Sequence, residues 1–400
     1  MDLTPFKNCF AHKQAVYIST NKDPLAPCCF FGKGINANNW NEYQEKVQKV
    51  DIAEGCKYCI DMEAGGATWS HRLQYNNDFY HNENYGKVFV AGVCFDNVCN
   101  LKCTTCHPSN SSQWIGDYTK LGLWKSPAHA REYIKLADDA PKKIEFLKNT
   151  LATAEYNTFR LDIFGGEPAI NPLIIDFIDW LANSEYAKKV MINVTTNGTR
   201  MFQKLIDYRP RFKSIMIQVS IDGIEKHFEY LRYGANWEEV KGNIAKYDSL
   251  AQRFANFTLS LHYTLSWMNS LHFADFYKWV AENTIDIAGL NLTKVITPKR
   301  YSVDMLNPES KNEIKNIVLN KINQIDISNK KPSKQLLYQH LVNLYVTSMD
   351  SYSEENYKQP DQFVEGRHML SKLDDIRDTN FKETFADVLP YYFKVTDGPV

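Results

Sequence analysis

The sequence lacks several features that would assign it to a common class of protein. It contains no apolar run close to the ~18 residues that a membrane-spanning helix requires. Its first residues, MDLTPFKNCF, have neither the basic nor the apolar segment of a secretory signal peptide. Its formal net charge of −1 gives no electrostatic reason to bind nucleic acid or a membrane surface. We therefore expect a soluble, cytoplasmic protein whose partners include neither a membrane nor nucleic acid.

Cysteine is absent from the last 294 residues, although the first 106 contain nine. An odd number of cysteines without an export signal argues against a disulfide framework. Scattered core thiols would not stop so abruptly along the chain, so the distribution favours a metal or iron–sulfur site. The nine fall into two groups, first Cys9, Cys28, Cys29, Cys56 and Cys59, then Cys94, Cys99, Cys103 and Cys106.

The hydrophobic fraction of 44% is sufficient for a packed core, and from residue 87 apolar segments alternate with helical ones such as 171–183 and 237–254. Short segments rich in Val, Ile, Leu and Phe are typical of strands that are covered on both faces. The segment between the first two predicted strands, residues 94–157, is unusually long and should hold two helices. The predicted strands are 87–93, 158–164, 190–196, 214–221, 257–265 and 287–296.

Six successive strand–helix repeats predict an α/β fold in which a parallel sheet curls into a partial (β/α)6 TIM-like barrel. We assign residues 86–300 to this barrel. Residues 1–85 form a cysteine-rich module with a predicted strand at 16–20 and a predicted helix at 39–50. Residues 301–400 form a helical C-terminal region that could cap the barrel mouth or bind a partner.

The spacing C-x3-C-x2-C places Cys99, Cys103 and Cys106 in one loop after the first predicted strand. Three thiolates from one loop can hold three irons of a [4Fe–4S] cluster and leave the fourth iron open to another ligand. Zinc is the rival interpretation, because tetrahedral zinc sites also use C-x2-C pairs, with His107 or Cys94 as the fourth ligand. A set of unligated core thiols is the third alternative.

Three further motifs fall where functional groups of such barrels gather, at the carboxyl ends of the strands. GGEP (165–168) follows the second predicted strand, TTNG (195–198) ends the third, and SIDG (220–223) ends the fourth. Each motif alone is explained as well by an ordinary turn or strand end. Together, in this order and behind a cysteine loop, they indicate one shared site.

With these motifs the segment 87–296 resembles the radical S-adenosylmethionine (SAM) superfamily. The resemblance implies that Cys99, Cys103 and Cys106 bind a [4Fe–4S] cluster whose open iron chelates SAM. It also implies reductive cleavage of SAM to a 5′-deoxyadenosyl radical, which abstracts a substrate hydrogen atom. The family usually has an aromatic residue before the third cysteine, and here Thr105 stands there, which we interpret as a variation in adenine packing.

The resemblance also implies a set of SAM-binding residues. The motif Gly165, Gly166, Glu167 and Pro168 would hold the methionine amino group, since an ammonium group needs carboxylate and carbonyl acceptors and glycine permits close approach of the backbone. The positions that would contact the SAM carboxylate and ribose, or line the same pocket, are Asn197, Ser220, Asp222 and Arg232. Arg232 alone would be taken for a solvated surface residue, although a guanidinium is a suitable partner for a carboxylate.

The N-terminal cysteines offer a second four-thiolate site, formed by Cys9, Cys28, Cys56 and Cys59, with Cys28 preferred to Cys29. Four thiolates suit a full [4Fe–4S] cluster or a tetrahedral zinc ion. The segment CKYCIDMEAGGATWSHR (56–72) resembles the N-terminal twitch (SPASM-like) module that one group of radical SAM enzymes uses for an auxiliary cluster. Within the barrel, Cys94 is expected to be a small buried strand residue rather than a hydrogen-atom donor.

The roles of two side chains of this module stay open: Glu63 and Arg72 could face the substrate or form a solvent-exposed ion pair. Ligation of the auxiliary cluster by four cysteines would favour electron transfer over substrate binding, because no iron is left open.

The resemblance implies a radical SAM enzyme that modifies a peptide or another polar metabolite, with a peptide slightly favoured over oxidation or epimerisation of a small molecule such as a sugar. It implies [4Fe–4S] and SAM as cofactors, a second [4Fe–4S] auxiliary cluster, and an electron donor such as flavodoxin or ferredoxin. Two alternatives remain: a zinc-stabilised interaction or nucleic-acid-binding protein without catalysis, and a non-catalytic iron–sulfur redox sensor.

Overall fold

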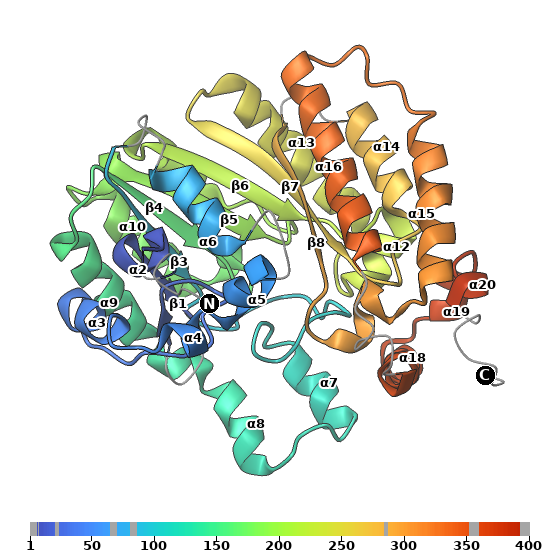
Figure 1. The fold of residues 1–400 in the computed structure, drawn as a ribbon, viewed down its shortest axis with the longest axis horizontal. Helices are drawn as coiled ribbons and strands as arrows, with labels where there is room; N and C mark the ends of the chain where they lie inside the picture. Colours follow the sequence, from blue (N-terminus) through green and yellow to red (C-terminus); the bar gives the residue numbers. More distant parts are fainter. Residues whose placement is uncertain are drawn as a thin grey trace. The chain divides into compact units, whose positions relative to one another are not determined.

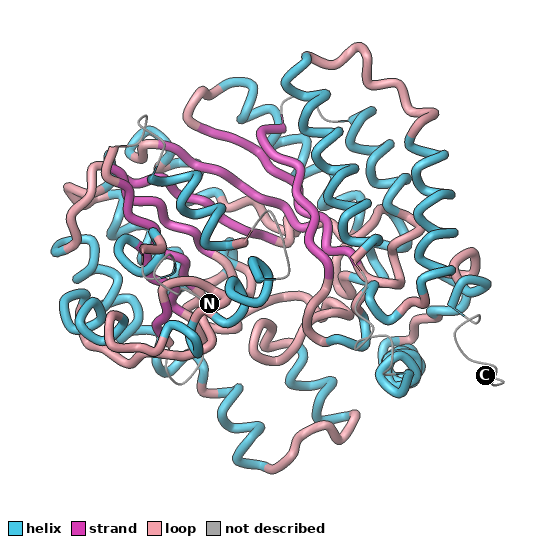
Figure 2. Tube along the Cα trace, viewed as in Figure 1, coloured by secondary structure: helices cyan, strands magenta, loops and turns pink. Residues whose placement is uncertain are grey.

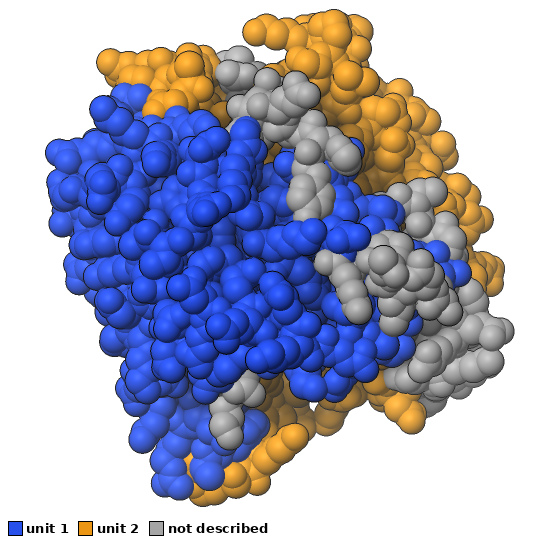
Figure 3. All heavy atoms as spheres, turned by 60° about the vertical axis from the view of Figure 1, so that its left-hand side comes forward, with its two compact units in different colours: residues 1–99, 128–195, 202–216 blue, residues 100–127, 196–201, 217–400 orange. Residues whose placement is uncertain are grey.

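The computed structural model describes residues 6, 8–20, 24–64, 70–80, 86–283, 287–351 and 360–392. Residues 65–69, inside the segment that resembles a twitch module, lie outside the described residues. The chain forms two compact units, the first comprising residues 1–99, 128–195 and 202–216, the second comprising 100–127, 196–201 and 217–400 (Figure 3). The boundaries that we expect at residues 85 and 300 stay predictions.

The strands form one mostly parallel sheet in the order β2-β1-β3-β4-β5-β6-β7-β8 (Figures 1 and 2). The parallel pairings β3 with β4, β4 with β5, and β7 with β8 are those that six strand–helix repeats require. The predicted α/β class and its six strands are therefore confirmed. The strand bounds are β1 (Ala15–Ile18), β2 (Leu25–Ala26), β3 (Val88–Val93), β4 (Thr158–Ile163), β5 (Val190–Thr196), β6 (Ser214–Ser220), β7 (Phe257–Leu265) and β8 (Ile287–Lys294).

The first unit extends the sheet with strands from the N-terminal segment. Strand β1 pairs in parallel with β3, Ala15 lying beside Val90, and forms an antiparallel pair with β2. All six residues of β3 are buried, which is typical of a strand covered on both faces. The cysteine-rich segment is therefore part of the same sheet, which the sequence analysis did not anticipate.

The helices of the first unit follow the predicted pattern, with α3 and α10 inside the segments 39–50 and 171–183. Asn171 begins α10: it is 1% exposed and its Oδ1 accepts hydrogen bonds from Leu173 N and Ile174 N. The helices are α2 (Phe10–Gln14), α3 (Trp40–Val47), α4 (Ile52–Gly55), α5 (Lys57–Ala64), α6 (His71–Tyr75), α8 (Pro127–Ile134), α9 (Ala140–Thr153), α10 (Pro172–Ala182) and α11 (Gln203–Asp207), with a π-helix η1 (Asn76–Tyr80) and 3-10 turns η3 (Leu136–Asp139), η4 (Pro168–Ile170), η5 (Ala187–Lys189) and η6 (Arg209–Arg211).

The second unit is largely helical beyond β8, as we expect for residues 301–400. Tyr345 of α16 stacks on Phe273 of α14 with 4.4 Å between ring centroids. Both rings are buried, so the last helices share a core with the strand–helix repeats of this unit. The helices are α7 (Trp114–Lys120), α12 (Glu225–Leu231), α13 (Trp237–Arg253), α14 (Phe273–Asn283), α15 (Pro308–Ile322), α16 (Pro332–Asp350), α18 (Pro360–Arg377), α19 (Phe381–Thr384) and α20 (Leu389–Tyr392), with 3-10 turns η7 (Lys299–Tyr301) and η8 (Val303–Met305).

The prediction of two helices between the first two barrel strands is wrong, because the segment holds three α-helices, α7, α8 and α9. Gly122 adopts φ +64° just after α7, a conformation that ends a helix at little cost only for glycine. Pro127 then starts α8, since proline fits the first helical turn. The two breaks divide the apparent first helix into short pieces.

Among the described residues, no helix is long and apolar enough to cross a membrane.

We expect Asn171→Ala to lower the free energy of unfolding by about 2–4 kcal/mol. The change removes a helix cap, worth about 1 kcal/mol, and also the amide that donates to Asp96 Oδ1 at 2.7 Å, which weakens the pairing of a buried carboxylate. The matched control is Asn39→Ala, which removes only the cap of α3 and should cost about 1 kcal/mol. Urea denaturation of both variants measures the difference, and equal losses would contradict the role of the Asp96 contact.

Candidate active site

The cysteine loop follows β3, and in the second unit its backbone is bonded to the end of α12. Lys102 N donates to Tyr233 O at 2.9 Å, and Thr104 N donates to Leu231 O at 2.7 Å. Cys103 and Cys106 are half-buried, while Cys99, at the end of the first unit, is buried. None of the nine cysteines forms a disulfide, in agreement with the expected reduced state.

A buried network of charges and rings holds the carbonyl group of Cys103. The indole Nε1 of Trp114 donates to Cys103 O at 2.9 Å. Arg377 of α18 lies over the Trp114 ring, with Cζ 4.6 Å from its centroid, and pairs with Asp117 at 2.9 Å. Lys102 also pairs with Asp117 at 2.9 Å. The sequence analysis missed Trp114 and Arg377, because 260 residues separate Arg377 from Asp117.

Arg232 lies in the second unit beside two of the predicted iron ligands. Its side chain is buried and its Nη2 donates to Asp222 Oδ1 at 3.0 Å, while its Nε has no hydrogen-bond partner among the described residues. Burial opposes its charge, but Asp222, Cys103 and Cys106 outweigh this effect and raise the pKa of Arg232. A buried guanidinium with an unpaired donor suits a nearby anionic group, so these residues fit a thiolate-bound cluster or a ligand carboxylate.

The GGEP motif forms a tight turn in the first unit. Gly165 and Gly166 have φ of +84° and +54°, a region that favours glycine. A Cβ atom on Gly165 would lie 1.9 Å from Cys94 Sγ, and one on Gly166 would lie 2.2 Å from Val98 O. Neither position therefore has room for a side chain. The absence of side chains here allows a ligand or another backbone segment to approach closely.

Glu167 and Cys94 complete this turn. The Glu167 side chain is fully buried and accepts a hydrogen bond from Ala169 N at 3.0 Å, which caps the 3-10 turn that Pro168 begins. The Cys94 thiol is buried against Gly165, and burial raises its pKa to about 12. This environment suits the expected role of Cys94 as a small packing residue.

In the second unit Asn197 hydrogen-bonds to neighbouring polar groups, whereas the resemblance implies that it lines the SAM pocket. Its Nδ2 donates to Asn100 Oδ1 at 2.9 Å, and its Oδ1 accepts from Thr199 N at 2.9 Å. Asn100 Nδ2 in turn donates to Thr199 Oγ1 at 2.9 Å. The TTNG turn therefore holds the residue that directly follows Cys99. Ser220 ends β6 and is half-buried.

The four predicted auxiliary ligands all lie in the first unit and line one small pocket, namely Cys9, Cys28, Cys56 and Cys59. Cys29 is exposed and lies 3.5 Å from His71 Nε2, so the pocket favours Cys28 as the ligand. Burial raises the pKa of Cys9 to about 11 and that of Cys56 to about 12. Without a metal these thiols are neutral, and a bound metal would have to displace their protons.

The same pocket has polar side chains beside its cysteines. His12 and Arg72 line it, and Glu63 pairs with Arg72. His12 Nε2 lies 3.3 Å from Cys56 Sγ. Arg72 lines the pocket, and its Nε donates to Glu63 Oε1 at 3.0 Å. The pair is largely buried, with side-chain exposures of 13% and 17%. Arg72 and Glu63 thus form an ion pair, which was one of the two alternatives, but the expectation that this pair is solvent-exposed is wrong.

Comparison with known proteins gives distant relatives. No family model matches the chain. It is 24% identical to a GTP 3′,8-cyclase of Vibrio parahaemolyticus over 53% of this chain and 57% of the relative, and 28% identical to one of Shewanella denitrificans over 55% and 58%. The chain thus matches little more than half the length of these curated relatives. A solved structure, native anSMEcpe with bound AdoMet, is 17% identical, covers 57% of this chain and 59% of its own, and has a TM-score of 0.38, too low to carry an argument.

We expect Gly166→Ala to destabilise the protein by at least about 1–2 kcal/mol, because alanine is strained at positive φ and its Cβ would collide with the backbone at Val98. The matched control is Gly242→Ala in α13, where nothing lies within 4 Å of the added atom. This control should stabilise the protein by about 1 kcal/mol through helix propensity. Denaturant unfolding distinguishes the two, and equal stability of both variants would show that the GGEP turn tolerates a side chain.

Proposed function

We propose that this chain, which belongs to the radical SAM superfamily, cleaves S-adenosylmethionine reductively and uses the resulting 5′-deoxyadenosyl radical to abstract a hydrogen atom from its substrate. The motifs of residues 99–106, 165–168 and 220–223 and the curated relatives support this assignment. A [4Fe–4S] cluster held by Cys99, Cys103 and Cys106 would supply the electron for this cleavage.

The observation that carries the proposal is the environment of Arg232. A buried cation with an unpaired Nε, next to Cys103 and Cys106, is costly unless an anion accompanies it. Asp222 neutralises the charge in part, and its Oδ1 also accepts from Thr264 N at 3.2 Å, which fixes the direction of the guanidinium. Arg232 is therefore suited to bind the carboxylate of SAM, and Asp222 to orient it.

The remaining roles concern binding. The Gly165–Gly166 turn would let the backbone approach the methionine amino group, and Glu167 would offer its carboxylate there. Asn197 would position the cysteine loop through Asn100, as its hydrogen bonds indicate. Trp114 would fix the Cys103 carbonyl and thereby the direction of that thiolate.

The auxiliary site is the second part of the proposal. The pocket of Cys9, Cys28, Cys56 and Cys59 would hold a second [4Fe–4S] cluster, with structural zinc as the alternative. Four cysteine ligands leave no iron open, so the site would pass electrons from a donor such as flavodoxin or ferredoxin.

The substrate is a peptide or another polar metabolite, and the curated relatives add a specific candidate. Because they are named GTP 3′,8-cyclases, a purine nucleotide is the second candidate substrate class for this chain. Incubation of the reduced protein and SAM with GTP separates the two classes, since a new nucleotide product would exclude the preference for peptides.

We expect Cys99→Ala to abolish formation of 5′-deoxyadenosine, because two thiolates do not hold the cluster that must reduce SAM. The measurement uses protein reconstituted anaerobically, with dithionite and SAM, and quantifies 5′-deoxyadenosine by chromatography. Cys29→Ala is the control, since that thiol is exposed and outside the auxiliary pocket. Turnover that survives in Cys99→Ala would refute the assignment, and wild-type protein that binds iron without cleaving SAM would point to a redox sensor.

We expect Cys56→Ser to lose about four of about eight irons per chain, the content of two [4Fe–4S] clusters. Cys29→Ser should keep the wild-type content because its side chain does not line the pocket. Iron and sulfide analysis of both variants makes the comparison. Zinc in place of the second set of irons in the wild-type protein would assign the auxiliary pocket to a structural metal instead.

A further inference from the structure

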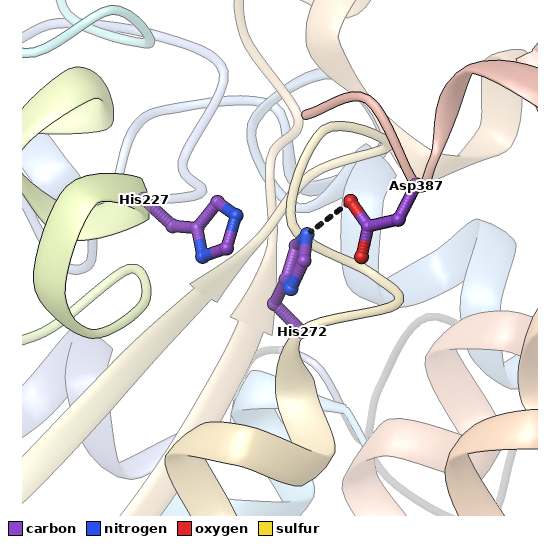
Figure 4. A group of neighbouring side chains, drawn as sticks. All are labelled: His227, His272 and Asp387. Carbon is purple, nitrogen blue, oxygen red and sulfur yellow. Dashed lines mark ion pairs between the residues drawn. The ribbon is translucent and has the colours of Figure 1, made fainter. Parts of the chain in front are cut away.

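Two histidines and an aspartate from distant parts of the chain converge in the second unit (Figure 4). His227 lies on α12, His272 directly precedes α14, and Asp387 lies between α19 and α20. Each offers one ligand atom, and these atoms lie within 4.8 Å of one another. None of the three residues belongs to the motifs on which the proposed function rests.

The outer hydrogen bonds of both imidazoles fix which nitrogen carries the proton. His227 Nε2 lies 3.0 Å from Thr384 O, and since a carbonyl only accepts, Nε2 is the donor and Nδ1 keeps its lone pair. His272 Nδ1 lies 3.2 Å from Asp275 Oδ2, so in the neutral ring Nδ1 donates and Nε2 keeps its lone pair. A carbonyl or carboxylate on the far nitrogen is the usual support of a metal-binding histidine.

The lone pair of His272 has no partner that suits it. The side chain is 4% exposed, and Nε2 has no hydrogen bond but lies 3.4 Å from Asp387 Oδ1, an ion pair when the ring is protonated (Figure 4). In the neutral ring this buried lone pair faces a carboxylate, so the site needs a positive charge between the two, either a proton or a metal ion.

We propose that His227, His272 and Asp387 bind a divalent transition-metal ion, with Zn²⁺ as the species that the N₂O ligand set favours, and with water in the fourth position. The two rings lie 3.6 Å apart at an interplanar angle of 26°. Their in-plane lone pairs converge on one ion only after one ring turns about its Cβ–Cγ bond, a torsion with a broad energy minimum, and the outer hydrogen bond of that ring must adjust with it.

Such an ion would join three segments of the second unit. Asp387 and Thr384 come from the C-terminal region. His227 lies on α12, and Arg232 is the C-cap residue of that helix. Asn269, three residues before His272, donates to Asp222 O at 2.9 Å. The metal would therefore anchor the C-terminal segment to α12, which ends at Arg232, and to the segment whose Asn269 holds Asp222.

The test uses the reconstituted holoenzyme, dialysed against a metal-free buffer and then titrated with Zn²⁺. We expect about one zinc per chain in the wild-type protein, affinity at least tenfold lower in Asp387→Asn, and affinity about 10–100-fold lower in Asp275→Asn, which loses only the outer carboxylate. Asp375→Asn, an exposed carboxylate of α18, is the matched control and should bind as the wild type does.

X-ray absorption at the zinc edge identifies the ligands. The proposed site gives nitrogen and oxygen neighbours at about 2.0–2.1 Å, with the outer scattering of imidazole, whereas zinc at the cysteines gives sulfur at about 2.3 Å. A sulfur shell, or equal affinity in the Asp387→Asn and Asp375→Asn variants, would overturn the proposal. Asp387 is exposed, with 55% of its side chain accessible, so its variant should fold. An unchanged circular-dichroism spectrum checks this. Radical SAM activity does not enter the readout, so the two proposals fail independently.

Discussion

The cysteine loop depends on two buried charges, those of Asp117 and Arg377, whose side chains are 2% and 3% exposed. Two desolvated charges are tolerated only when they are well paired, and removal of one partner typically costs about 3–5 kcal/mol. Lys102 gives Asp117 a second cation, and Arg377 stacks on Trp114. The indole that this stacking orients is the donor to Cys103. The C-terminal helix α18 thus takes part in the geometry of the predicted iron ligands.

The two groups of cysteines differ in how the protein holds them. In the N-terminal pocket, the four thiols come from two buried hydrophobic clusters, one with Cys9 and Cys28 and the other with Cys56 and Cys59. The C-x3-C-x2-C loop is extended instead, and its shape comes from hydrogen bonds to Tyr233 and Leu231. The N-terminal pocket is lined by four thiols, whereas the loop carries three. That difference matches the distinct roles proposed for the two sites.

The similarity to distant relatives and the chemistry of the candidate site support different parts of the proposed function. The curated relatives, of which this chain matches little more than half the length, support the similarity to the radical SAM superfamily. They say less about the substrate, which is contacted by parts of a protein that vary most, the loops. The chemistry of Arg232, Asp222 and the cysteines therefore supports the proposed reaction more strongly than it supports any one substrate.

The sequence by itself determined the order of strands and helices and the sites of the motifs. All six predicted barrel strands were found because continuous apolar segments bounded by polar ones are a local signal. The cysteine spacing, the glycine pair at 165–166 and the cap Asn171 are local in the same sense. The number of helices predicted between β3 and β4 was wrong for a local reason too. Gly122 and Pro127 break this segment into more helices than the two that we predicted.

Only the tertiary structure decided which distant residues meet. It placed Cys28, and not Cys29, in the lining of the N-terminal pocket, paired Arg377 with Asp117, and gathered His227, His272 and Asp387. It also gave Asn197 a contact with Asn100 and placed β1 beside β3. These contacts join residues far apart in the chain, and no periodicity or spacing encodes them, because they arise only when packing of the core brings the segments together.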